Sequence, residues 1–354
     1  MEKKYNIHDL LGVDVSSNFS DIIDGYNHYI RHFLTEKEVG IDYEIFDFEK
    51  LSKESILGKV GDFLKIKNGV CFPEQKYAIA FSGGKIQEYT EYANHATNLL
   101  IQTLLLKKNC SFVHSAGVEL DGRGIIFPAI GGVGKTILMS ALRDRGDFKF
   151  FGDDYSIVSS QGEMYSYPSD FSIYPYHIPL FPELKNSPEG FYLRRRKIFK
   201  LYYELKRVIN FIGKRVFGIG HPLLKGWCAN YVKVPARKLI PVSKIGRKTA
   251  LYASIFLERY EGREVVLEKM DKDALVNKII AILNLEFGES MNYCSAAAAL
   301  GEFNLLEFQA QQKRVLSEAF SAIDTYSLQI PSSMSPKEYC SRIPQKIEDV
   351  IRKS

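Results

Sequence analysis

The sequence predicts an α/β protein with an N-terminal α+β region and a basic helical insertion. Three observations predict this class. A short apolar run, Ile125–Ile130, is followed at once by a glycine-rich loop and by a helical pattern over Lys135–Arg145. Other short apolar runs bounded by turn residues alternate with helical segments along the chain. A strongly basic block interrupts this alternation between residues 184 and 250.

The N-terminal region, residues 1–95, has the mixed spacing of strands and helices. Two runs alternate as strands do, and three have the apolar spacing of helices. We expect helices at Ile7–Leu11, Phe19–Phe33 and Tyr89–Lys107, a strand at Tyr43–Phe48, and a strand pair over Val70–Phe81.

The core is expected to come from two parts, residues 96–183 and 236–354, with the basic helical insertion, residues 184–235, between them. The segment Asp121-Gly122-Arg123-Gly124 is typical of a hairpin turn, and Gly146 suits the end of the helix that begins at Lys135. The first part should hold strands at Ser111–Leu120, Ile125–Ile130 and Phe148–Phe151, and a hairpin over Tyr155–Tyr167. The second part should hold strands at Leu239–Val242, Thr249–Leu257 and Thr325–Ile330, and helices at Lys272–Leu285, Cys294–Leu300, Leu306–Ala322 and Ile343–Arg352.

The composition is that of a globular protein without a membrane span. The chain has 354 residues, of which 45% are hydrophobic and 25% charged. No apolar h-region follows the charged start Met1-Glu2-Lys3-Lys4, and no apolar run is long enough to cross a bilayer. The five cysteines are too far apart to indicate a zinc site or a disulfide framework. We therefore expect a reducing, cytoplasmic location.

The net charge of +5 is unevenly distributed. Residues 184–250 contain 17 Lys and Arg against two acids, a charge of +15, so the remainder of the chain carries −10. A basic amphipathic helix or helix pair is expected from Arg194 to about Phe217. Four interpretations of the 194–227 segment stay open: recognition of an anionic acceptor, contact with an anionic membrane surface, contact with nucleic acid, and an ordinary solvated helix. No nucleic-acid motif accompanies the charge, so a nucleic-acid partner is the least favoured of the functional three.

The glycine loop, Gly131-Gly132-Val133-Gly134-Lys135-Thr136, predicts a site for a nucleoside triphosphate. Glycines let successive backbone N–H groups face phosphate oxygens, and the helix that follows presents its positive end to them. Lys135 is expected to reach the β- and γ-phosphates of ATP, and Thr136 to offer its hydroxyl to Mg²⁺. Ala129 stands where the usual pattern has its first glycine, which is costly only if that position needs a positive φ.

Asp153 and Asp154 follow the next apolar strand, and strand ends at this edge of an α/β sheet carry ligand sites. Beside a triphosphate, one carboxylate can hold Mg²⁺ while the other takes the proton of an attacking hydroxyl. The alternative is a simple turn, since Gly-Asp-Asp also ends strands without further function.

These motifs, taken with the hairpin over residues 112–124 that contains His114, resemble the catalytic core of HPr kinase/phosphorylase and its relatives. The resemblance covers about residues 110–158. It implies the mixed sheet fold shared with phosphoenolpyruvate carboxykinase, and a homo-oligomer. It also implies that Asp153 is the base, that Asp154 binds metal or phosphate, and that His114 supports Asp153. The N-terminal region and the basic block do not fit that enzyme, so we expect an acceptor other than HPr.

The function expected from the sequence is an ATP-dependent kinase that phosphorylates a hydroxyl on a small molecule, such as a sugar or amino acid, or on a peptide. Lys135, Thr136 and the two aspartates carry this expectation. The alternatives are a nucleotide sensor or slow NTPase that uses the loop as a switch, and a membrane- or polyanion-binding adaptor with a vestigial loop.

Overall fold

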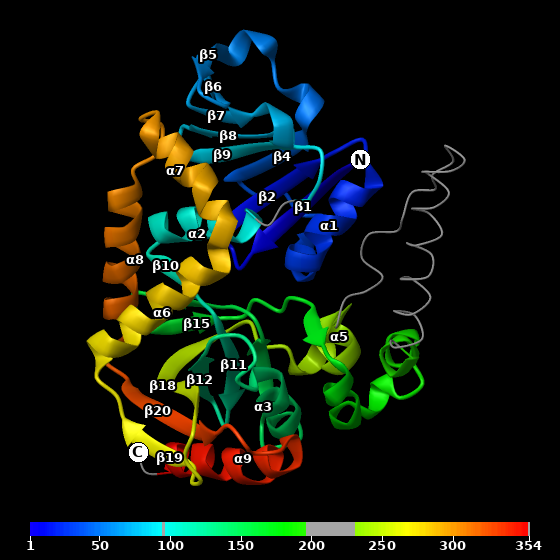
Figure 1. Cartoon of the computed structure of the whole chain (residues 1–354), viewed down its shortest axis with the longest axis vertical. Coiled ribbons are helices and arrows are strands. Elements are labelled where there is room, and N and C mark those ends of the chain that lie inside the picture. Colours follow the sequence, from blue (N-terminus) through cyan, green and yellow to red (C-terminus); the bar gives the residue numbers. More distant parts are fainter. Residues whose placement is uncertain (94–95, 196–230, 353–354) are drawn as a thin grey trace, which may run out of the picture. The chain divides into compact units, whose positions relative to one another are not determined.

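The computed structural model describes residues 1–93, 96–195 and 231–352, so the predicted basic helix lies outside the described residues apart from Arg194 and Arg195. Figure 1 shows a mixed α/β protein in which long sheets are covered by helices. The chain divides into two compact units. The first unit combines Met1–Ser169 with Ser243–Ser354, and the second is Asp170–Val242.

The N-terminal part of the first unit is a nine-stranded sheet. Its β2–β4 and β4–β9 pairs are parallel and the other pairs are antiparallel. Helix α1 (Ser20–Ile30) contributes buried side chains to the same core as these strands. The strands in spatial order are β3 (Leu34–Thr35), β1 (Glu2–Ile7), β2 (Leu11–Ser16), β4 (Tyr43–Asp47), β9 (Lys85–Thr90), β8 (Tyr77–Ser82), β7 (Gly69–Phe72), β6 (Phe63–Ile66) and β5 (Ile56–Val60).

A second nine-stranded sheet carries the glycine loop. Its longest member, β18 (Lys248–Tyr260), pairs in parallel with β12 and β20 and, at its start, antiparallel with β15. The strands run in the order β10 (Cys110–Val113), β14 (Ser156–Ser159), β15 (Glu163–Tyr165), β18, β12 (Arg123–Pro128), β11 (Ser115–Leu120) and β13 (Lys149–Gly152), with β20 (Asp324–Pro331) beside β18 and β19 (Val266–Lys269) beside β20.

Helices of the first unit cover this sheet, as Figure 1 shows. Helix α2 (Thr97–Lys107) is buried along almost its whole length and packs against β10 and α8. Helix α3 (Lys135–Leu142), which follows the glycine loop, packs against α9 (Pro336–Arg352). The helices α6 (Lys272–Phe287) and α7 (Met291–Ala299) each pack against α8 (Leu305–Phe320), and α7 also packs against β7.

The second unit is small and contains a two-stranded sheet of β16 (Phe171–Ile173) and β17 (Val232–Val234). Short 3-10 helices at Pro175–Leu180 and Pro182–Leu184 follow β16, as the proline-rich sequence favours. Helix α5 (Ala236–Leu239) follows β17.

Most of the predicted elements are confirmed, but several were assigned wrongly. Ser111–Leu120 forms two strands, β10 and β11, separated at His114, and the helix predicted from Ile343 begins at Pro336. Ile7–Leu11 is not a helix: it joins β1 to β2 through His8 and Asp9, whose φ angles are 56° and 61°. Ile7 and Leu11 are cross-strand partners and both are buried, so a tight turn gives the same apolar spacing as one turn of helix. The prediction therefore confused the two because their hydrophobic pattern is the same.

Two further errors concern the start of a helix and the type of an element. The predicted helix over Tyr89–Lys107 begins only at Thr97, because Tyr89 and Thr90 still belong to strand β9. Leu239–Val242 is not a strand, since Leu239 ends the short helix α5 and Val242 starts a 3-10 helix.

Because of the buried carboxyl group of Glu88, we expect the free energy of unfolding to depend on pH in an unusual way. Its side chain is fully buried on β9 and accepts a hydrogen bond from Tyr43 Oη, and burial raises the pKa of Glu88 to about 7 from 4.5. Because the folded pKa lies above the unfolded value, this group stabilises the fold at low pH and loses that contribution as the pH rises through 7. We expect wild type to lose on the order of 3 kcal/mol more than Glu88→Gln between pH 4.5 and 8.

Urea unfolding at several pH values measures this difference, with Glu49→Gln, a substitution at an exposed residue, as the control. An identical pH dependence in wild type and Glu88→Gln would contradict the assignment of a buried, titrating Glu88.

Candidate functional site

Three segments of the second sheet meet at the glycine loop. Strand β11 begins at Ser115, directly after His114, and pairs with the end of β12 at Pro128. The backbone N–H of Ala129 donates to His114 O at 3.3 Å. On the other side, β11 pairs with β13, which ends at Gly152, and Ser115 N donates to Asp154 O at 3.2 Å. The hairpin therefore brings His114, the loop and the aspartate pair to one edge of the sheet.

The loop backbone requires glycine at two of its three glycine positions. Gly132 and Gly134 have φ angles of 83° and 120°, a region that favours glycine. A Cβ on Gly134 would lie 2.9 Å from the ring of Tyr339. Ala129 has no positive φ, so the alanine at that position adds no backbone strain.

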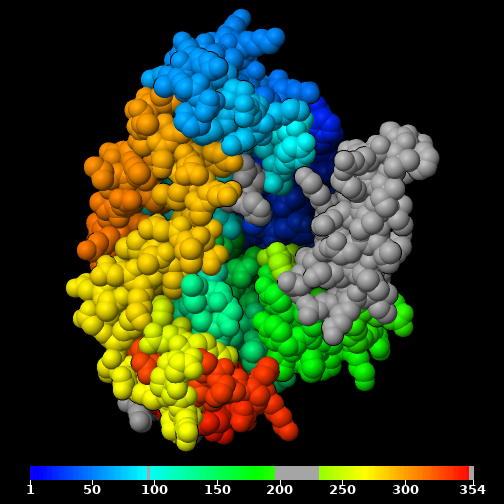
Figure 2. Space-filling view, viewed as in Figure 1, coloured from blue at the N-terminus to red at the C-terminus, as the bar shows by residue number. Residues whose placement is uncertain are grey.

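The loop is supported from behind and open in front. Arg259, near the end of β18, donates from Nε to Val133 O at 3.0 Å and lies over the Tyr339 ring. On the open side Ile130 is 48% exposed. Figure 2 shows the teal-green loop segment at the surface of the viewed face, beside the yellow helices. A ligand can therefore reach the loop from solvent.

Lys135 is the most constrained charge of the site. Its side chain is 7% exposed, and Nζ lies 2.9 Å from Ala129 O, 3.4 Å from Ile130 O and 2.9 Å from His114 Nε2. Burial lowers the pKa of Lys135, and the nearby carboxylates of Asp154, Asp153 and Glu286 oppose that shift. A buried ammonium that binds only uncharged acceptors can form stronger hydrogen bonds with an anionic one, such as a phosphate oxygen.

Thr136 and Asp153 face each other at the start of α3. Thr136 Oγ1 donates to Asp153 Oδ2 at 2.7 Å, and Asp153 is 3% exposed. Asp154 is only partly buried. No three His, Cys, Asp or Glu side chains of the described segments are clustered so as to hold a metal ion by themselves.

His114 is held neutral. Burial first, and the Lys135 charge second, lower the pKa of His114 well below its usual value. If the Lys135 ammonium donates to Nε2, the imidazole proton is on Nδ1, which is buried without a hydrogen-bond partner in the described part of the chain. The ring also packs edge-on against Tyr155, with centroids 5.4 Å apart.

Glu286 is a member of the site that sequence reasoning missed. It lies at the end of α6, and Glu286 Oε1 is 3.5 Å from His114 Nε2. Its side chain remains 30% exposed, and burial raises the pKa of the carboxyl group. No motif surrounds it in the sequence, because only the packing of α6 brings it to residues some 150 positions earlier.

Several cations of the basic block have partners elsewhere. Arg247 pairs with Asp9, Lys248 with Glu163 at 2.7 Å, and Lys238, in the second unit, with Glu189 at 2.8 Å.

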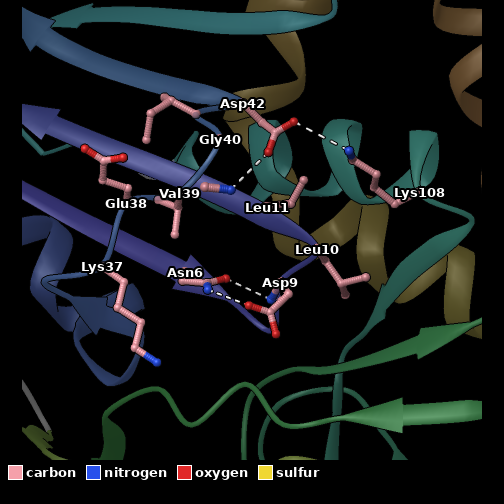
Figure 3. Close-up of a pocket in the computed structure, with 12 residues that line it drawn as sticks. Asn6, Asp9, Leu10, Leu11, Lys37, Glu38, Val39, Gly40, Asp42 and Lys108 are labelled. Carbon is pink, nitrogen blue, oxygen red and sulfur yellow. Dashed lines mark hydrogen bonds and ion pairs between the residues drawn. The ribbon is translucent and has the colours of Figure 1, made fainter.

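A pocket of about 490 Å³ lies by β1, β2 and the loop of residues 37–42, and shares no lining residue with the glycine loop (Figure 3). Several of its polar side chains bind other residues of the pocket wall. Asp42 accepts from Gly12 N at 3.0 Å and lies 3.6 Å from Lys108 Nζ, while Asn6 donates to Asp9 at 2.7 Å. The pocket is therefore separate from the group of Lys135, Thr136 and Asp153 at the glycine loop.

No protein-family model matches this chain, and a search of curated proteins finds no significant match. None of the helices in residues 1–93, 96–195 and 231–352 is long and apolar enough to span a bilayer.

We expect alanine substitutions at the two kinds of loop glycine, with and without a positive φ, to differ in their effect on stability. Gly134→Ala should destabilise the ligand-free protein by about 2 kcal/mol or more, because it combines a positive φ with a close approach to Tyr339. Gly131→Ala should change stability by less than about 0.5 kcal/mol, because its Cβ would meet nothing within 4 Å and its φ is not positive. Chemical unfolding of both variants compares them, and equal effects would contradict this loop geometry.

Proposed function

We propose that this chain binds ATP at the glycine loop and transfers its γ-phosphoryl group to a hydroxyl of an acceptor. The observation that best supports this proposal is the convergence of Lys135, Thr136 and Asp153 beside an open loop at the start of α3. Each side chain is of the type that phosphoryl transfer needs: a cation for phosphate oxygens, a hydroxyl for Mg²⁺ and a carboxylate for a proton.

The loop is suited to a polyanion for two reasons. Its backbone N–H groups lie at the N-terminus of α3, where the helix dipole favours negative charge. Among the described residues, the Lys135 ammonium contacts two carbonyl oxygens and an imidazole nitrogen, which are weaker acceptors than phosphate oxygens. Triphosphate binding should therefore move Lys135 away from His114.

Mg²⁺ fits the residues at this position. Thr136 Oγ1 and the Asp153 carboxylate already converge within 2.7 Å, and Asp154 adds a second carboxylate. Mg²⁺ in nucleotide sites is usually held by one or two protein oxygens together with phosphates and water. Thr136 and Asp154 would hold the ion, which when bound neutralises negative charge on the phosphates.

The proposed transfer step assigns the proton and the bonds as follows. The carboxylate of Asp153 takes the proton of the acceptor hydroxyl, and the acceptor oxygen forms a bond to the γ-phosphorus. The bond from that phosphorus to the bridging oxygen breaks, and ADP leaves with the electron pair. Lys135 neutralises charge on the transferring group. Asp153 and Asp154 are adjacent, and exchange of their two roles is the alternative assignment.

The strand arrangement around the loop supports the resemblance to HPr kinase-like enzymes. The β11–β12 hairpin precedes the loop, and β13 after α3 leads into the Asp-Asp pair. The likeness is proposed for this core alone, and the acceptor is proposed to differ from HPr.

Asp153→Asn tests the base assignment. The amide keeps an oxygen that can accept from Thr136, so ATP affinity measured by calorimetry should change little, whereas transfer should fall about 100-fold or more. Transfer is measured with [γ-³²P]ATP against sugars, amino acids and peptides, and Asp144→Asn, whose side chain is 84% exposed, is the control.

Two outcomes would contradict the proposal. Transfer that survives in Asp153→Asn would remove the base assignment. ADP formation in wild type that no acceptor changes would favour a nucleotide sensor or slow NTPase instead.

A further inference from the structure

Helix α6 places a carboxylate beside His114. Glu286 is the penultimate residue of α6, and α6 packs against α8 and against β10, the strand that leads into His114. Its Oε1 atom lies 3.5 Å from His114 Nε2, which is itself 2.9 Å from Lys135 Nζ. Glu286 therefore lies two contacts away from the ammonium that marks the phosphate position.

The position of Glu286 is electrostatically costly. It lies at the C-terminal end of a helix, where the helix dipole disfavours negative charge. Burial raises the pKa of Glu286, the charge of Asp154 raises it further, and Lys135 opposes both effects. A carboxylate with a raised pKa beside a buried histidine and a buried lysine is an arrangement that functional sites often share.

The compensation by Lys135 is lost when the ammonium moves to a triphosphate. Glu286 Oε1 and His114 Nε2, which lie 3.5 Å apart, would then be without the nearby cation, while the Glu286 side chain keeps 30% of its surface exposed. A replacement donor must come from solvent or from the acceptor. We place the acceptor on this side of the site, because Glu286 is the partly exposed carboxylate beside His114 and Lys135.

We propose that Glu286 binds the acceptor and selects one that carries a hydrogen-bond donor, an ammonium or a second hydroxyl, next to the hydroxyl that is phosphorylated. This inference rests on the proposed kinase function. The acceptor class is thus an amino alcohol or a polyol. An anionic group at that position is disfavoured, because the carboxylates of Glu286, Asp153 and Asp154 already surround a single ammonium. An anionic acceptor, as the basic block suggests, would have to carry its charge farther from the transferred hydroxyl.

Four two-carbon alcohols test this selection, because they differ only in the group next to the carbon that bears the hydroxyl. They are 2-aminoethanol, 1,2-ethanediol, ethanol and glycolate. ADP formation from MgATP is measured with each. In wild type we expect stimulation by 2-aminoethanol and 1,2-ethanediol, and none by ethanol or glycolate. Glu286→Gln should raise the KM for 2-aminoethanol about tenfold or more and change that for 1,2-ethanediol less, because an amide still accepts from a hydroxyl.

Glu289→Gln is the matched control, since Glu289 is an exposed glutamate three residues further along the chain. Glu289→Gln should leave the urea unfolding curve and the ATP affinity measured by calorimetry unchanged. Glu286→Gln should be as stable as wild type or more stable, because it removes a charge in an unfavourable position, and it should still bind ATP. Three results would overturn the acceptor assignment and leave the nucleotide site standing. They are equal effects of all four alcohols on wild type, no effect of any of them while ATP binds, and an unchanged KM for 2-aminoethanol in Glu286→Gln. A wild type that does not bind ATP would overturn the proposed function and this inference together.

Discussion

The buried ammonium of Lys135 is the interaction on which the rest of the site depends. Removing a charge from water costs several kcal/mol, and the two carbonyl oxygens of Ala129 and Ile130 together with His114 Nε2 offset that cost here. The same contacts tie the end of β12 to the residue before β11. They also fix the charge state of His114, because the neighbouring cation and burial both keep the imidazole neutral. A ligand that moves the Lys135 ammonium therefore changes the hydrogen bonds of Ala129, Ile130 and His114.

The surrounding fold keeps the loop in place for this purpose. The β11–β12 hairpin and β13 bring the loop and the aspartate pair to one edge, and β18 and α9 contribute Arg259 and Tyr339 behind the loop backbone. Helix α6 adds Glu286 from a part of the chain that also packs on α8. Rigid elements thus hold the back of the loop, while its exposed front can accept a ligand.

Local chemistry in the sequence was sufficient for much of this core. The glycine loop, its flanking strand and helix, and the aspartates were predicted because glycine conformation, apolar runs and capping act over a few residues. Ile7–Leu11 was assigned wrongly, because a tight turn between paired strands has the same apolar spacing as a helix. Glu286 could not be predicted, because its role depends on the tertiary position of α6. The functional roles of His114, Asp153 and Asp154 stay predictions.

Triphosphate binding is proposed to move Lys135 away from His114. Nitrogen NMR of histidine side chains during a MgATP titration tests this most directly, with His114→Asn identifying the resonance. The predicted result is a saturable change in the His114 Nε2 shift, as the nitrogen loses the donor at 2.9 Å. An unchanged His114 signal at concentrations that saturate ATP binding, or no ATP binding at all, would contradict the account.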